Sequence, residues 1–329
     1  MKHESTPIER LARIAAVVLA AAALWPAQAL AQVPARFYWN NLSGSNGVSV
    51  IFNSLSGNSN PFDPANTVEP DAEFDASMAI VGYAHMFPLF DRAATGAILL
   101  PMGRVSATGT VAGLTANQSA NGFGDPTLEF TINLIGPPAQ KNLADALRYQ
   151  PGFSLNLLAD LALPIGEYHS DQALNLGQNR WYGRIGAPIV WQLGSWVPGQ
   201  RTTIEALPAV WLFGNNTDYL GKTLKTDPLF QLDAHITRDF TERFWGAIDG
   251  VWYSGGRASI NGVQGQKLNN VGVGLTLGYT ITDNVNLTFG YKSTVNDSAP
   301  TDLRMDGFQV MLTFGWHPLI EGSKRLKGE

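Results

Sequence analysis

The 329-residue chain contains no cysteine, and only 15% of its residues are charged. The absence of cysteine excludes disulfides, thiol catalysis and cysteine-bound metals. Charged residues make up nearer a quarter of a typical soluble globular protein, so this chain is poor in charge. Its formal net charge is −5 and it has no long runs of Lys or Arg, which argues against nucleic acid as a partner.

The chain also lacks the common signatures of catalysis. It contains no Gly-x-Ser-x-Gly, His-Glu-x-x-His or Gly-x-Gly-x-x-Gly motif. Its five histidines are scattered, and a hydrolase would need a Ser or Thr nucleophile beside a His base. His85, His169 and His235 are available as bases, but no spacing marks a partner for any of them. We therefore expect no enzyme activity, no cofactor and no metal site.

The first 31 residues have the features of a secretory signal. Three basic residues precede an apolar stretch at 14–24, and Ala29-Leu30-Ala31 is a small-x-small cleavage site, so cleavage is predicted after Ala31. An uncleaved anchor is the alternative, although the apolar stretch is short for a spanning helix. The chain after this segment carries 19 basic and 25 acidic residues, a formal charge of −6. It has no other apolar run of spanning length, so a membrane-spanning fold would have to be a β-barrel.

Strict alternation is the strongest pattern in the chain, and it is clearest near the C-terminal end. In 271–281, 285–291 and 308–316, apolar side chains alternate with small or polar ones. Successive side chains of a strand point to opposite faces, so each segment has one apolar face. Repeats of ~10 residues with this alternation are typical of barrels that cross an outer membrane, with apolar residues towards lipid and polar residues towards the lumen.

About twelve such segments are predicted, at 46–54, 74–86, 94–107, 123–134, 151–163, 179–192, 201–213, 227–238, 243–254, 269–281, 285–295 and 307–316. Their connections alternate between short turns and longer polar loops, except for a long inner joint at 136–150 with a helical turn near 142–149. Short periplasmic turns and longer outer loops are typical of barrels. A soluble two-sheet sandwich is the alternative, but it would carry more charge and show no such alternation of loop lengths.

The sequence thus predicts an all-β protein: a transmembrane antiparallel up-and-down β-barrel of about 12 strands. The barrel is expected over residues 32–316, followed by a periplasmic tail at 317–329. Alternation places a sparse set of ionisable residues inside, namely Glu129, Asp160, Arg184, Glu205, Asp233, His235, Asp249 and Lys292. They either line a solute path and select among permeants, or form cross-strand ion pairs that brace a narrow barrel.

The large aromatic residues have two interpretations. Most are expected in girdles at the two membrane interfaces, where amphipathic rings prefer to lie. This set comprises Trp181, Trp191, Trp211, Trp245, Trp252, Tyr279 and Trp316. The alternative is that some of them are stacking platforms for an aromatic substrate.

Several segments together resemble one known family. They are Tyr83-Ala84-His85, Leu100-Pro101-Met102-Gly103, Gly122-Phe123-Gly124-Asp125-Pro126, Leu232-Asp233-Ala234-His235 and, most specifically, Phe244-Trp245-Gly246-Ala247-Ile248-Asp249-Gly250-Val251-Trp252-Tyr253-Ser254-Gly255-Gly256-Arg257. The chain resembles the "MetA-pathway of phenol degradation" family of outer-membrane transporters over nearly its whole length after the signal. The resemblance implies a barrel and a role in the uptake of aromatic or other hydrophobic compounds.

The predicted function is a passive channel or transporter for small, hydrophobic or aromatic solutes in the outer membrane of a Gram-negative envelope. The expected partners are outer-membrane lipid and lipopolysaccharide, the barrel-assembly machinery and the solute itself. One alternative is a structural or adhesive envelope barrel with a filled lumen. The other is an outer-membrane hydrolase.

The alternation can be tested in the last two strand-like segments. Replacing Leu287 or Leu312 with Arg is expected to reduce the heat-resistant folded band on gels, because a charge on the lipid face costs about 2–4 kcal/mol at the midplane. Changes at the neighbouring Asn286 or Thr313 should be much milder. Equal damage from both sets would contradict the assigned faces.

Overall fold

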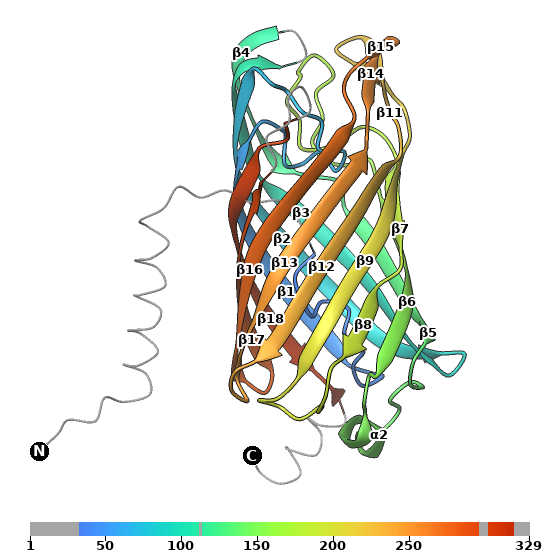
Figure 1. Ribbon diagram of the computed structural model, residues 1–329. Helices are drawn as coiled ribbons and strands as arrows, with labels where there is room; N and C mark the ends of the chain where they lie inside the picture. The colour runs from blue at the N-terminus through green and yellow to red at the C-terminus, as the bar shows by residue number, and fades with distance from the viewer. Residues whose placement is uncertain (1–32, 112–113, 296–301, 319–329) are drawn as a thin grey trace, which may run out of the picture.

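The computed structural model describes residues 33–111, 114–295 and 302–318, and its main feature is a closed antiparallel β-barrel (Figure 1). In these residues the wall has 12 strand positions. They are β1 (Asn46–Gly57), β2 (Ala72–Leu89), β3 (Arg92–Val111), β4 (Leu114–Phe123) with β5 (Thr127–Ile135), β6 (Phe153–Ala162), β7 (Tyr182–Gly186) with β8 (Ile189–Gln192), β9 (Thr202–Phe213), β12 (Leu229–Asp239), β13 (Phe244–Gly255), β16 (Leu268–Thr282), β17 (Val285–Thr294) and β18 (Met305–Trp316). Pairing of β1 with β18 closes the cylinder, and the predicted fold class is confirmed.

Two strand positions of the wall are each occupied by two short strands. The predicted strand 179–192 is split into β7 and β8, whereas β4 formed in the stretch predicted as a loop between 94–107 and 123–134. Both β4 and β5 pair with β3, and Gly124-Asp125-Pro126 separates them. Likewise β7 and β8 both pair with β9, and Ala187-Pro188 separates them. Proline has no N–H to donate to the ladder, so each proline ends regular pairing at its position.

The two ends of the barrel differ. At one end, here called the turn end, connections are mostly brief, and the long joint contains α2 (Leu143–Arg148), whose N-cap Asn142 accepts a bond from Asp145 N. At the other, the loop end, β10 (Asn216–Tyr219), β11 (Lys222–Thr226), β14 (Ala258–Ile260) and β15 (Val263–Gln264) form a small separate sheet. Among the described residues, no helix has the length and hydropathy needed to span a membrane.

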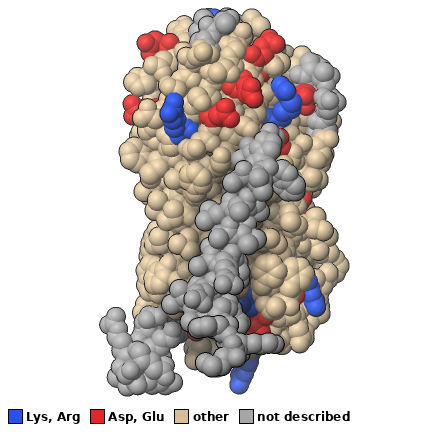
Figure 2. All heavy atoms as spheres, turned by 90° about the vertical axis from the view of Figure 1, so that its left-hand side faces the viewer, with Lys and Arg blue, Asp and Glu red and all other residues tan. Residues whose placement is uncertain are grey.

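The outer wall is apolar between the ends. Large hydrophobic side chains are exposed on nearly every strand, including Val50, Phe52, Leu128, Leu161, Ile185, Ile236, Ile248, Val273, Leu275, Leu312 and Phe314. On the visible part of the face in Figure 2, charged residues gather towards the ends and leave most of the wall between them uncharged. Such an exposed apolar band is the surface that a barrel presents to lipid.

Towards the loop end the interior contains two clusters of large apolar side chains. One buried cluster contains Leu55, Phe74, Met78 and Val105 from the wall, together with Phe62, Leu174 and Leu176 from loops that fold inwards. A second contains Leu229, Val251, Tyr253 and Leu268 from the wall with Leu303 and Met305. In this part of the barrel large apolar side chains therefore also point inwards, among buried polar ones such as Asn53, Gln231, Asp233 and Asn270.

A tight backbone contact holds one of these inward loops against the break between β4 and β5. Asp125 accepts bonds from Gly166 N at 2.9 Å and Gln178 N at 2.8 Å. A Cβ on Gly166 would lie 2.6 Å from the carbonyl carbon of Gly124. Only glycine allows this approach, and the Gly-Asp-Pro segment thereby fixes the loop that carries Leu174 and Leu176.

Replacing Gly166 with Ala is expected to destabilise the folded barrel by roughly 1–3 kcal/mol, the usual range for overpacking a buried contact. The measurement is the temperature at which the compact band disappears on heat-modifiability gels. The control is Gly47→Ala, because a Cβ at Gly47 would meet only the Phe314 carbonyl oxygen at 3.9 Å. Equal stability of the two variants would contradict the packing described here.

Candidate functional site in the barrel lumen

Residues 33–45, here called the inner segment, run inside the barrel before β1 begins. At one end Lys292 Nζ lies 3.5 Å from the Val33 carbonyl oxygen. At the turn end Ser43 N donates to Gln140 O at 2.8 Å and Gly44 N to Met86 O at 2.7 Å. The segment therefore crosses the polar part of the lumen and is fastened at the turn end.

Two wall carboxylates hold the inner segment. Glu205 accepts from Arg36 N at 2.8 Å and from Trp39 Nε1 at 2.7 Å, and it also accepts from Thr203 Oγ1. Asp239 accepts from Arg36 Nη1 at 2.7 Å and, on its other oxygen, from Arg201 Nε at 2.8 Å. Charge-assisted bonds of this kind are stronger than neutral ones.

Aromatic rings enclose the Arg36 guanidinium. Its central carbon lies 4.5 Å from the Trp39 ring centre and 4.3 Å from that of Trp245. An arginine side chain stays protonated in proteins, so this is a cation held between two indole faces.

Trp39 in turn lies against the wall. Its ring centre is 4.7 Å from that of Trp196, in the connection between β8 and β9. The Arg201 guanidinium lies 5.3 Å from the Trp39 ring and 5.6 Å from the Trp196 ring. The indole of Trp39 thus has a stacking partner, a cation over its ring and an acceptor for its N–H, all supplied by the wall.

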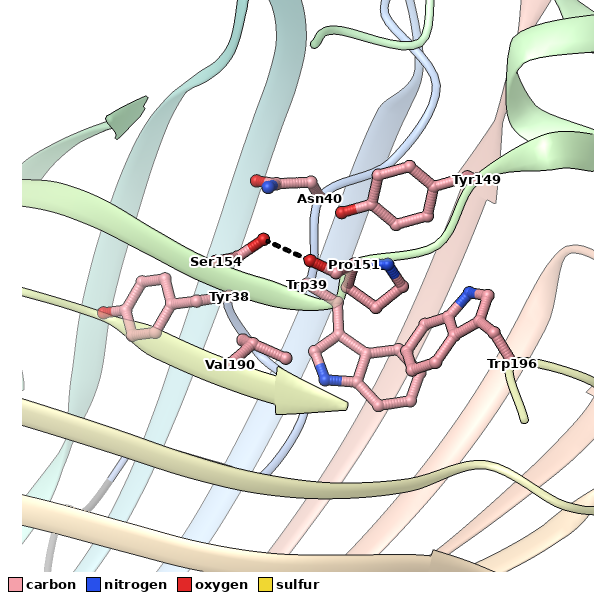
Figure 3. Close-up of a pocket in the computed structure, with 8 residues that line it drawn as sticks. All are labelled: Tyr38, Trp39, Asn40, Tyr149, Pro151, Ser154, Val190 and Trp196. Atoms are coloured by element: carbon pink, nitrogen blue, oxygen red, sulfur yellow. Dashed lines mark hydrogen bonds between the residues drawn. The ribbon is translucent and has the colours of Figure 1, made fainter. Parts of the chain in front are cut away.

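Two small hollows lie beside the inner segment, and Tyr38 and Val190 line both of them. Figure 3 shows the first, where Tyr38, Trp39 and Trp196 lie around a space bordered by Tyr149 and Val190. The second is lined by inner-segment residues, by 188–190 and 205–207 of the wall and by His235. Each hollow has a volume of about 10 Å³, which is room for about one water molecule.

The eight ionisable residues predicted inside are all buried, with between 0% and 8% of each side chain exposed. The structure brings three of them together on neighbouring strands. Arg184 Nε donates to Asp160 Oδ2 at 2.7 Å, and Glu129 lies opposite Asp160 in the β5–β6 pairing. Tyr38 joins this group, because its hydroxyl donates to Glu129 at 3.3 Å and accepts from Arg184 Nη2 at 3.3 Å.

Another four form a row across β9, β12, β13 and β17. Glu205 lies opposite His235, which lies opposite Asp249, and His235 Nδ1 is 2.6 Å from Asp249 Oδ1. Lys292 lies beyond Gly274 in the same row. The eighth, Asp233, accepts from Gln231 Nε2 at 2.8 Å. Within the described residues, no three His, Asp or Glu side chains are grouped as a metal site would require.

Two predicted girdle residues face inwards instead. Trp211 donates to Gln231 at 2.6 Å and lies under Arg184, and Trp245 lies over Arg36. Trp211 is an even number of residues from Glu205 on β9, and Trp245 is an even number from Asp249 on β13. Each tryptophan therefore points to the same face as that inward carboxylate. Strict alternation therefore places them inside, and the preference of tryptophan for interfaces gave the wrong face. Trp181, Trp191 and Trp252 are 56%, 52% and 39% exposed on the outer wall.

The inner segment itself was not predicted. The available signal was an Arg and three aromatic residues, Arg36 to Trp39, in the stretch between the predicted signal and the first strand. Such residues are unusual in a solvated leader, but their partners lie about 90 to 200 positions away along the chain. The proposed cleavage after Ala31 falls outside the described residues, as does the tail beyond residue 318, whereas His317 bonds the Ser43 carbonyl oxygen at 2.9 Å.

A closed 12-strand barrel with an apolar exterior and ionisable side chains inside defines the class of outer-membrane β-barrels. Within this class, the chain belongs to the family described as "Putative MetA-pathway of phenol degradation", which matches residues 53–314. The resemblance noted in the sequence is confirmed.

One solved structure supports the fold. The chain is similar to an outer membrane channel from Pseudomonas putida F1, with 21% identity and a TM-score of 0.69 over 86% of this chain and 99% of that one. It is also similar to the translocator domain of the autotransporter NalP from Neisseria meningitidis, with 12% identity and a TM-score of 0.49 over 83% of this chain and 89% of that one. No curated protein matches the sequence.

Glycine at position 278 makes room for the ring that faces Arg36, because a Cβ there would lie 2.0 Å from Trp245 Cε2. Replacing Gly278 with Ala is therefore expected to displace the indole and loosen the inner segment. Amide hydrogen exchange over residues 33–45 should become at least several-fold faster. The control on the adjacent strand is Gly250→Ala, where a Cβ would meet no atom within 4 Å. Unchanged exchange in the Gly278 variant would contradict the role given to Trp245.

Proposed function

We propose that the protein is an outer-membrane channel, closed in this conformation, for the passive passage of small apolar or aromatic solutes. The observation that carries the proposal is the presence of two large apolar clusters inside the loop end. Water-filled porins have polar interiors. Here Leu229, Val251, Tyr253 and Leu268 point inwards from neighbouring strands, and each is at least 95% buried.

The buried apolar region formed by these clusters, here called the chamber, would give an apolar solute a favourable place to enter when the loops that cover it move. Burial of apolar surface contributes roughly 25 cal/mol per Å², so a solute gains free energy when it leaves water for this interior. The chamber is covered by loops, through Phe62, Leu174, Leu176 and Leu303, rather than by the wall alone. Loops are the parts of a barrel that move most readily, and their displacement would open the chamber.

Below the chamber the polar half of the lumen is closed by the inner segment. Its contacts with the wall are hydrogen bonds, ion pairs and ring contacts. None of these is covalent, so the segment can be displaced without breaking the barrel. The proposed path runs from the loop-end chamber, past Arg184 and Tyr38, to the turn end.

A structural barrel with a filled lumen is the second candidate, and the burial of the inward side chains favours it. Against it, buried polar atoms without a hydrogen-bond partner occur in the described part of the lumen, among them Asp160 Oδ1, Arg180 Nε and Arg36 Nη2. Native interiors rarely leave such atoms unsatisfied unless water reaches them. We infer that the lumen is hydrated, which suits a path more than a solid filling.

Uptake by proteoliposomes separates the two candidates. Labelled toluene should enter liposomes containing the barrel faster than protein-free liposomes, whereas glucose should not. Val251→Asp adds a second carboxylate opposite Asp233. It is expected to slow toluene uptake at least about tenfold, because a passing apolar solute must desolvate the added charge. Val251→Ala keeps the chamber apolar and should retain uptake.

Both variants must show the heat-modifiable band of a folded barrel. Toluene uptake that never exceeds that of empty liposomes would overturn the proposal and favour the structural barrel. Equal uptake through the Val251→Asp and Val251→Ala variants would show that the solute does not pass through the chamber.

A further inference from the structure

We propose that the wall groups around Trp39 form a binding site for planar aromatic compounds that carry one hydrogen-bond donor, and that such a compound opens the turn end by displacing Trp39. The site, here called the indole site, consists of Trp196, Arg201 and Glu205. The inference rests on the proposed function, because it adds a recognition step to the same path.

Trp39 occupies the indole site as an internal ligand. The wall provides one complementary group for each property of its side chain. Trp196 stacks on the ring at 4.7 Å, Arg201 lies 5.3 Å from the ring centre, and Glu205 Oε1 accepts from the indole N–H at 2.7 Å. A free compound with a flat π surface and a single N–H or O–H would make the same three contacts.

Because the Glu205 carboxylate is buried, a bound compound must supply a hydrogen-bond donor to it. Glu205 is only 6% exposed, and its Oε1 accepts from both Trp39 Nε1 and Thr203 Oγ1. An aromatic compound without a donor would leave this buried charged group short of one hydrogen bond. Such a loss typically costs a factor of ten or more in affinity. The site therefore discriminates by the donor as well as by the ring.

Displacement of Trp39 would weaken the closure of the lumen. Trp39 lies three residues from Arg36, and the two share a cation–ring contact at 4.5 Å. The same Glu205 side chain also accepts from Arg36 N through its other oxygen. Loss of Trp39 from the wall thus removes one of the main anchors of the inner segment. It also leaves Arg36, the next anchor, without one of its ring contacts.

The probe is 3-methylindole, which reproduces the tryptophan side chain, and its matched control is 1,3-dimethylindole, which lacks the N–H. Trp39→Ala vacates the indole site. The purified variant should bind 3-methylindole saturably, at least about tenfold more tightly than the wild type, because no internal ligand competes. Binding of 1,3-dimethylindole should be at least about tenfold weaker. Adding Trp196→Leu should abolish binding, whereas adding the lipid-facing Trp191→Leu should not.

Opening is measured as ion conductance of the wild-type barrel in planar bilayers. Addition of 3-methylindole should raise the conductance several-fold, and 1,3-dimethylindole should not at the same concentration. Equal responses to both compounds, equal affinity of wild type and Trp39→Ala, or binding that survives Trp196→Leu would each overturn the proposal.

These results are independent of toluene uptake. Toluene uptake without 3-methylindole binding or a conductance response refutes the indole site alone. Saturable 3-methylindole binding with no uptake of toluene refutes the proposed passage and leaves the binding site in place. Heat-modifiability gels confirm that each variant is folded before it is scored.

Discussion

The structure depends first on closure of the sheet. Lipid offers no hydrogen bonds, so every N–H and C=O of the spanning strands must pair within the protein, and only a closed barrel achieves this with strands. The β1–β18 ladder, from Asn46 paired with Trp316 to Gly57 paired with Met305, is the seam that completes the cylinder. Once the sheet closes, alternation divides the side chains into a lipid-facing set and an enclosed set.

Enclosure then determines what the inner side chains can do. A charge inside a narrow barrel must find a partner, because an unpaired buried ion is costly. Arg184 finds Asp160, and His235 finds Asp249. The carboxylate of Glu205 instead finds its donors on the inner segment. The same contacts therefore satisfy the wall carboxylate and hold the inner segment in the lumen.

The apolar chamber completes this division of the lumen. Carboxylates towards the turn end bind the inner segment, and the two large apolar clusters lie towards the loop end, where inward loops cover them. A solute that is apolar but carries one polar group matches this order of environments along the path. The order of environments, more than any single residue, links the fold to the proposed passage.

The strands of the wall could largely be predicted from local sequence patterns, whereas the contacts inside the barrel largely could not. Strand positions were predictable because lipid exposure imposes a period of two on every strand, and the inward placement of Asp160 and Arg184 needed only that period. The β4–β5 break was marked by Gly124-Asp125-Pro126, but its effect depends on a distant loop. The inner segment has no periodicity, and its partners come from strands far along the chain. Trp211 was misplaced because residue preference was set above alternation.

The central claim is that the inner segment closes an otherwise passable lumen, and single-channel conductance tests it most directly. The comparison is between the wild-type barrel and a variant with Arg36→Gly, Tyr38→Ser and Trp39→Gly together, which removes the side-chain anchors described above and leaves the wall sequence unchanged. The account predicts a mostly closed wild type and a steady, several-fold larger conductance in the folded variant. The same conductance in both would show that the segment does not close the path.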